Sequence, residues 1–168
     1  MCQHRSYIVT ESATVYSLID SDSHTAIREK HSIRDSSPIH ADRQASIELL
    51  PVDLFDPTTW TLHFDDPDGK PDWWTDAHEK AARLQLALDH RVFLRHGIYT
   101  FGGDLNLGSL TSLPANAKLS AGGYLYLGRL TSLPANAKLS AGGYLNLGRL
   151  TSLPAGANVK AVQVFLKS

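Results

Sequence analysis

Three side chains near the start of this 168-residue chain belong to types that hold metal ions. Cys2, His4 and His24 offer one thiolate and two imidazoles, all of which zinc accepts as ligands. They meet if the first hairpin of the chain brings its N-terminus beside a helix that begins near residue 23. Their spacing matches no standard metal motif, so the alternative is hydrogen-bonded histidines and an incidental thiol. Zinc is the only cofactor that the sequence suggests, and with it a metal-dependent enzyme in residues 1–70.

A second set of candidate residues lies in the C-terminal half, where the sequence repeats. Rows 102–121, 122–141 and 142–161 align at a period of twenty residues, and LTSLPANAKLSAGGYL stands at 110–125 and again at 130–145. The rows vary mainly in three columns. The candidate partner-binding residues in these columns are Asp104, Asn106, Tyr124, Tyr126, Arg129, Tyr144, Asn146 and Arg149.

Tyrosine and arginine are the side chains most enriched at interface hot spots. If these columns face outward, the repeat is a scaffold with a changeable face that binds a protein partner. Two alternatives stay open. The tyrosines and arginines are solvated residues that keep a sheet soluble, or they stack bases and contact the phosphates of a nucleic acid.

Columns of leucine at the same period indicate how the rows fold. A column of identical apolar residues is typical of a solenoid, in which each coil stacks its leucines on the next because no coil closes a core alone. The alternation in YLYLG predicts a short strand with leucines inward, so stacked rows predict a parallel sheet along one face. The columns begin in the first row with Leu105, Leu107, Leu110, Leu113 and Leu119.

The pattern L-x-L-x-x-L-T-S-L-P, at twenty residues per turn, resembles the short leucine-rich repeats of bacterial and phage proteins, including type III-secreted effectors. The resemblance covers about residues 97–161. It implies a solenoid used mainly to bind other proteins, and a setting in which a phage or mobile-element protein sequesters a host defence protein. The asparagine that follows L-x-L in other leucine-rich repeats is absent, since Leu110 stands in that column. The large cysteine-dependent catalytic domain of some effectors has no counterpart in this chain.

The N-terminal half predicts a small α+β unit. SYIVT and TVYSL read as a hairpin, a short helix begins near Ser23, and ASIELLP and TWTLHFD read as two more strands. Residues 72–96 predict a long helix with Thr75 as its N-cap and Gly97 at its end. We therefore expect an α+β protein with an α+β domain at 1–71, a capping helix at 72–97 and a three-coil solenoid at 98–168.

The C-terminal segment NVKAVQVFLKS departs from the repeat. Its alternation of Val162, Val164 and Leu166 predicts a strand that closes the stack. If the edge of that strand is unpaired, it can pair with another copy of the chain and form a homo-oligomer.

Charge is divided unequally along the chain. Residues 1–100 carry sixteen acidic and ten basic side chains, a balance of −6, and residues 101–168 carry one acidic and six basic, a balance of +5. A basic repeat favours a partner with an acidic surface. The single cysteine, the absence of an apolar leader and the lack of an apolar run of roughly 18–20 residues predict a cytoplasmic protein with no membrane segment.

Overall fold

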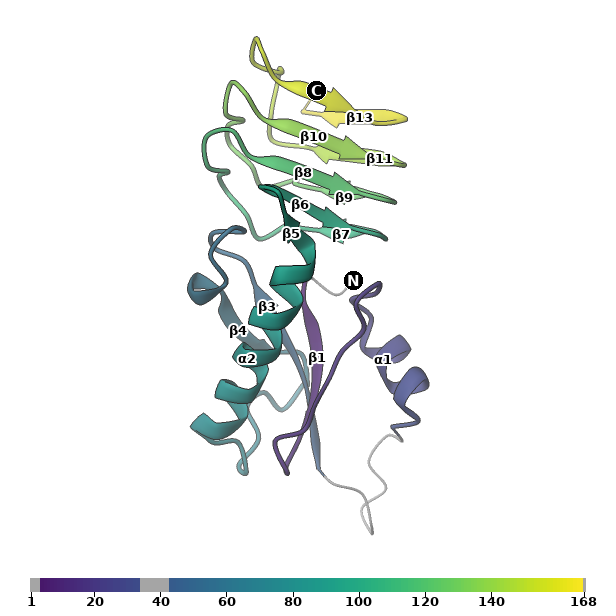
Figure 1. Ribbon diagram of the computed structural model, residues 1–168, viewed down its shortest axis with the longest axis vertical. Coiled ribbons are helices and arrows are strands. Elements are labelled where there is room, and N and C mark those ends of the chain that lie inside the picture. Colours follow the sequence, from purple (N-terminus) through teal and green to yellow (C-terminus); the bar gives the residue numbers. More distant parts are fainter. Residues whose placement is uncertain (1–3, 34–42, 168) are drawn as a thin grey trace. The chain divides into compact units, whose positions relative to one another are not determined.

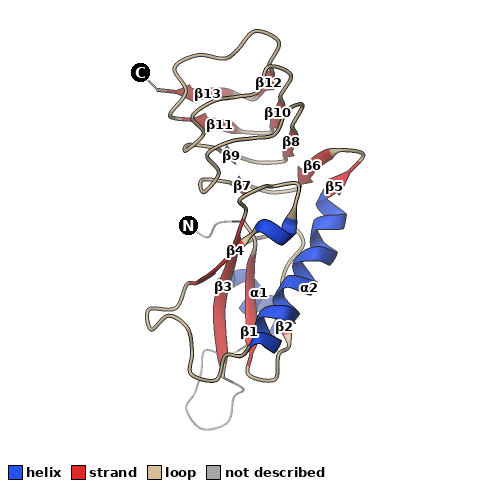
Figure 2. Ribbon diagram, turned by 90° about the vertical axis from the view of Figure 1, so that its left-hand side faces the viewer, coloured by secondary structure: helices blue, strands red, loops and turns tan. Residues whose placement is uncertain are grey.

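The structure of the protein is a computed structural model that describes residues 4–33 and 43–167 (Figures 1 and 2). It is an α+β fold, as expected, and it divides into two compact units. The N-terminal unit contains residues 1–50 and 61–89, and the solenoid unit contains residues 51–60 and 90–168. No helix among the described residues is both long enough and apolar enough to cross a membrane.

The N-terminal unit is built on one antiparallel sheet in the order β2-β1-β3-β4. All five residues of β1 are buried, and β1 lies between the two helices of the unit in Figure 1. The predicted hairpin and both predicted strands are confirmed. The strands are β1 (Ser6–Thr10), β2 (Val15–Tyr16), β3 (Gln44–Leu50) and β4 (Thr61–Phe64).

Helix α1 (His24–His31) begins where the sequence predicts, because the side chain of Ser23 accepts a hydrogen bond from the backbone amide of Ala26 at 3.2 Å. Helix α2 (Asp76–Phe93) follows Thr75, whose backbone amide donates to His78 Nδ1 at 2.9 Å. The imidazole thus takes the place that Glu or Gln occupies in a capping box.

The long helix ends earlier than the sequence predicts. Residues 94–96 read as helix, yet the helix stops at Phe93 and β5 (Leu94–Arg95) pairs antiparallel with β6 (Ile98–Phe101). His96 and Gly97 have φ of 53° and 71°, and two consecutive residues of positive φ form the tight turn that joins the strands of a hairpin.

The solenoid unit consists of stacked coils that contribute to two parallel sheets (Figure 2). The sheet predicted from YLYLG runs β13-β11-β9-β7, and its strands are β7 (Leu105–Asn106), β9 (Leu125–Tyr126), β11 (Tyr144–Leu147) and β13 (Gln163–Leu166). A second sheet, which the sequence did not reveal, runs β12-β10-β8-β6-β5 through the KLSA segments. Its further strands are β8 (Lys118–Ala121), β10 (Lys138–Ala141) and β12 (Asn158–Lys160).

The coils stack in register at the period of the sequence. Leu119 pairs with Leu139 and Leu125 pairs with Leu145, so the leucine columns form rows that are buried except at the C-terminal end, where Leu153 is 38% exposed. The last coil is shorter: Leu145 pairs with Val164, nineteen residues further on. The predicted closing strand is confirmed over Gln163–Leu166, where Val164 and Leu166 continue the columns, but Val162 precedes this strand and is exposed.

Within the solenoid unit, aromatic side chains pack against the first coil. The ring of Phe93, in the last turn of α2, lies 5.8 Å from Tyr99 and 5.3 Å from Phe101. The 51–60 segment adds Trp60, which is almost fully buried, contacts His90 and donates from its indole nitrogen to the carbonyl oxygen of Asp53 at 2.7 Å. This segment contains the 3₁₀ helix η1 (Pro57–Thr59). The end of the stack is thus covered by side chains from two separate parts of the sequence.

In rows two and three, close backbone contact requires the first of the two glycines that open the row. A Cβ on Gly142 would overlap the carbonyl oxygen of Gly122 in the coil before it, whereas a Cβ on Gly102, the equivalent residue of the first row, would meet nothing within 4 Å. At this position, a residue with a side chain is therefore excluded in every coil that stacks on a preceding coil.

We predict that Gly142→Ala lowers the free energy of unfolding by about 1–3 kcal/mol, because the coils must separate to accept the methyl group. Thermal denaturation monitored by circular dichroism measures the change. The matched substitution Gly102→Ala should leave the melting temperature nearly unchanged. Equal effects of the two substitutions would contradict the stacking of row three on row two at this corner.

Candidate functional site

Four aromatic side chains form a patch on the outer surface of the β7-β9-β11-β13 sheet. The rings of Tyr124 and Tyr144 are stacked, with centroids 5.0 Å apart and planes 10° apart. Tyr126 meets Tyr124 edge to face at 6.2 Å, and Phe165 meets Tyr144 at 5.6 Å. We call these four residues the aromatic face.

The aromatic face is open to solvent although its rings contact one another. Tyr124, Tyr144 and Phe165 are 37%, 41% and 44% exposed, while the leucines that alternate with the tyrosines are buried. Aromatic pairs in these offset and edge-to-face geometries hold one another in place. The result is a rigid apolar surface whose rings still offer their edges and hydroxyl groups to a partner.

Phe165 is the member of this face that the sequence did not reveal. A twenty-residue period would place it in the buried column of Leu145. Because the last coil is one residue short, Phe165 pairs instead with Asn146 and projects outward. The alternation of Val164 and Leu166 on either side of it is the signal that could have identified it.

The other three candidates in these columns have shorter side chains, and each accepts a hydrogen bond from a backbone amide. Asp104 accepts a hydrogen bond from the amide of Tyr124 at 2.8 Å. Asn106 and Asn146 accept from the amides of Gly108 and Gly148 at 3.1 and 3.0 Å, two residues ahead of each in its own turn. Their side-chain oxygens thus shape the coil beside the aromatic face.

The two arginine candidates lie on another side of the coil. Arg129 and Arg149 are exposed, and Arg149 lines a hollow of about 290 Å³ together with Thr131, Ser132 and Thr151. Among the described residues, neither arginine makes a cation–π contact with a tyrosine. The arginines thus lie in the turns that follow the strands, and their binding of a partner together with the tyrosines stays a prediction.

The other parallel sheet carries a basic surface, which we call the lysine face and which consists of Lys118, Lys138 and Lys160. Lys118 and Lys138 are paired in register on adjacent strands, and Lys160 lies opposite Ser140. The three lysines line an open hollow of about 360 Å³. No acidic side chain lines this hollow, and none of the three lysines forms an ion pair with a described residue.

The C-terminal coil leaves apolar side chains in solvent. Strands β12 and β13 stand last in their sheets, and in the part of the chain that the structure describes no strand pairs with their outer edges. Val162 is 77% exposed, and Leu153, Phe165 and Leu166 are also exposed. Pairing of this edge with another copy stays a prediction.

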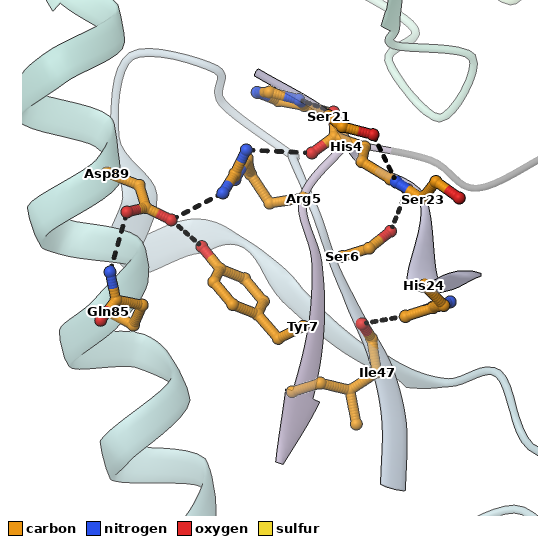
Figure 3. Close-up of polar contacts among 11 residues, drawn as sticks. His4, Arg5, Ser6, Tyr7, Ser21, Ser23, His24, Ile47, Gln85 and Asp89 are labelled. Carbon is orange, nitrogen blue, oxygen red and sulfur yellow. Dashed lines mark hydrogen bonds and ion pairs between the residues drawn. The ribbon is translucent and has the colours of Figure 1, made fainter. Parts of the chain in front are cut away.

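The N-terminal unit contains a buried ion network centred on Arg5 (Figure 3). The guanidinium is fully buried and contacts two carboxylates, Asp22 Oδ1 at 3.0 Å and Asp89 Oδ2 at 2.8 Å. His4 Nδ1 lies 2.7 Å from Asp22 Oδ2, and the phenol of Tyr7 donates to Asp89 Oδ2 at 3.1 Å. Sequence reasoning missed this network, because it joins residues up to 84 positions apart.

Burial and neighbouring charges shift the pKa values of the network in opposite directions. Burial alone would raise the pKa of Asp22, but the charge and hydrogen bond of His4, together with the charge of Arg5, outweigh it and lower that pKa. Burial lowers the pKa of His4 although the charge of Asp22 opposes the shift, and burial raises the pKa of Tyr7, which stays a donor. The lowered pKa of Asp22 stabilises the fold above its unfolded-state value of about 3.9, and this contribution is lost as the pH falls through the folded-state value.

The predicted metal ligands do not all fall within this network. His4 is held by Asp22, and His24 lies in a separate group with Glu48 and Asp65. Cys2 lies outside the described residues. The sequence suggested neither carboxylate, since both lie far from His24 along the chain.

Comparison of the chain with protein-family models, with curated proteins and with solved structures finds no match.

We predict that Arg5→Met lowers the free energy of unfolding by about 3–5 kcal/mol, because it leaves two buried carboxylates without their shared cation. Arg43→Met is the matched control: Arg43 also bridges two carboxylates, those of Glu11 and Asp72, but it is 52% exposed. Because water screens that pair, its loss should change stability little. Urea denaturation of both variants measures the difference, and a mild effect of Arg5→Met would show that the network is not a structural centre.

Proposed function

We propose that this protein is a non-enzymatic binding module, and that the aromatic face of a leucine-rich-repeat-type solenoid holds a protein partner. The observation that carries the proposal is the continuous cluster of Tyr124, Tyr126, Tyr144 and Phe165, each ring in contact with the next and three of them more than one third exposed. The proposal extends to the setting that the repeat pattern implies, in which the protein sequesters a host protein.

The physics of the face favours a protein partner. Tyrosine and phenylalanine supply large contact areas from side chains with few rotatable bonds, so little conformational entropy is lost when a partner covers them. The stacking of Tyr124 on Tyr144 and the backbone pairing of β9 with β11 hold these rings in place before binding. A preorganised surface of this kind spends less of its contact energy on ordering.

Charge adds to the choice of partner. Asp104 is the only acidic residue in 101–168, whereas that stretch carries six basic residues. Its carboxylate is already engaged with the Tyr124 amide. The stretch 101–168 is therefore basic as a whole, and we expect the partner to present an acidic surface with an apolar centre.

The proposal predicts that Tyr124→Ser with Tyr144→Ser weakens partner binding at least about 30-fold, the loss expected of hot-spot residues. Immobilised full-length protein retains partners from a bacterial lysate, and mass spectrometry compares the variants. The matched control, Lys118→Ser with Lys138→Ser, changes the opposite sheet and should retain the same partner. Thermal melts should show both variants folded.

The proposal is contradicted if the wild type and the tyrosine variant retain the same proteins in the same amounts. It is also contradicted if the tyrosine variant unfolds while the lysine variant does not, because the rings then hold the stack together and do not face a partner.

A second candidate is nucleic-acid binding, which the lysine face favours. Lys118 and Lys138 repeat along the stack with no acidic residue lining the hollow between them, as expected of a surface that contacts successive phosphates. The acidic N-terminal half and the small number of cations count against it.

This candidate predicts that the protein binds a fluorescent single-stranded oligonucleotide with an affinity that falls steeply between 50 and 200 mM salt. Changing both Lys118 and Lys138 to Ser should reduce this salt dependence by the equivalent of about two phosphate contacts. Fluorescence anisotropy measures both quantities. Undetectable binding at low salt, or an affinity that does not depend on salt, removes nucleic acid as a partner.

A further inference from the structure

Three potential metal ligands meet in the N-terminal unit outside the ion network described above. The ligand atoms of His24, Glu48 and Asp65 all lie within 4.8 Å of one another. His24 Nδ1 and Asp65 Oδ2 are 3.3 Å apart. The three residues come from different elements, so their meeting is a property of the fold and not of local sequence.

The fold brings each ligand to the same place by a separate contact. His24 is the first residue of α1, after the N-cap Ser23, and is buried. Glu48 is buried in β3, two residues from Ser46, and the Ser46 hydroxyl accepts a hydrogen bond from Arg28 of α1. Because residues two apart in a strand share a face, Glu48 is on the face of β3 that α1 covers. Asp65 directly follows β4, and its backbone amide donates to the carbonyl oxygen of Ser46 at 2.9 Å.

The hydrogen bond made by one ring nitrogen of His24 determines the tautomer of the neutral ring. It therefore determines which nitrogen can accept on the side of the carboxylates. Nε2 lies 3.0 Å from the carbonyl oxygen of Ile47 (Figure 3), and because a carbonyl only accepts, Nε2 carries a proton. In the neutral ring, Nδ1 then presents its lone pair to the carboxylate of Asp65. A proton or a metal ion between these two atoms would join them.

This arrangement is the outer-shell pattern of histidine ligands in metalloproteins. A metal-binding histidine almost always donates its other ring N–H to a carboxylate, a backbone carbonyl or water, which fixes the tautomer and the ring orientation. The Ile47 carbonyl oxygen fills that role for His24. Nδ1 is the ring nitrogen on the side where Glu48 and Asp65 converge.

The spacing and the charge also fit a divalent ion. Ligand atoms at zinc distances of 2.0–2.2 Å in a tetrahedral site lie about 3.3–3.5 Å apart, which matches the 3.3 Å from His24 Nδ1 to Asp65 Oδ2. Two carboxylates carry two negative charges, which a divalent cation neutralises.

We propose that His24 Nδ1 and the carboxylates of Glu48 and Asp65 bind one divalent transition-metal ion of the zinc class. An imidazole with two carboxylates suits zinc and cobalt, whereas magnesium and calcium prefer oxygen ligands alone. Three protein ligands leave the fourth tetrahedral position to water. Asp65 is 47% exposed, so solvent reaches the site from its side.

The test is titration of the full-length protein, freed of metal with a chelator, with Zn²⁺ by isothermal calorimetry and with Co²⁺ by visible absorption. We expect one ion per chain and the visible bands of four-coordinate cobalt. Asp65→Asn and Glu48→Gln preserve the shape of each side chain but remove a charged ligand, and each should weaken Zn²⁺ binding at least about tenfold. Circular dichroism verifies that both variants are folded.

Two controls separate this site from other ligands. His96→Asn replaces an exposed histidine by a residue that also accepts its φ of 53°, and should bind Zn²⁺ as the wild type does. Cys2→Ser should also bind as the wild type does, and the cobalt complex should lack an intense thiolate-to-metal band. Failure of the wild type to bind either ion in a 1:1 ratio overturns the proposal. So does unchanged binding by folded Asp65→Asn and Glu48→Gln, or loss of binding in Cys2→Ser.

Discussion

The pairing of equivalent residues on successive coils is the constraint on which the solenoid unit depends. Because Leu119 pairs with Leu139 and Leu125 with Leu145, residues at the same position of successive rows are neighbours on the surface of the sheet. A substitution in one row therefore changes one place on that surface. The glycine corners allow the backbones to approach closely enough for this pairing. The stacked tyrosines and the paired lysines are consequences of the same twenty-residue period, on opposite parallel sheets.

Sequence reasoning recovered the features that rest on periodicity and missed those that rest on distant contacts. The leucine columns predicted the stack, and alternation and capping residues predicted the N-terminal strands and both helices. The KLSA sheet was missed because its alternation of polar and apolar residues spans only four positions and includes alanine, which is small and weakly apolar. The candidate tyrosines were found from their columns, whereas Phe165 was displaced by a coil one residue short. Neither the Arg5–Asp89 pair nor the group at His24 leaves a local signal, since each joins separate elements.

The two units solve the problem of a small core in different ways. The solenoid buries uniform leucine rows and places its polar residues outside. The N-terminal unit instead buries Arg5 with two aspartates and a tyrosine, so part of its interior is held by charge and hydrogen bonds. Such a network is costly to disrupt and specifies how strand β1 meets its helices, whereas the repeat tolerates change at its outward positions.

The central claim is that rows separated by twenty residues stack as adjacent parallel strands, and a distance between coils tests it most directly. In a Cys2→Ser background, nitroxide labels at Lys118→Cys and Asn158→Cys would be attached to β8 and β12, with β10 between them. Two steps of about 4.8 Å place these backbones roughly 10 Å apart. We predict strong dipolar broadening in the electron paramagnetic resonance spectrum. The stack would be contradicted if the spectrum of the doubly labelled protein equalled the sum of the spectra of the two singly labelled proteins.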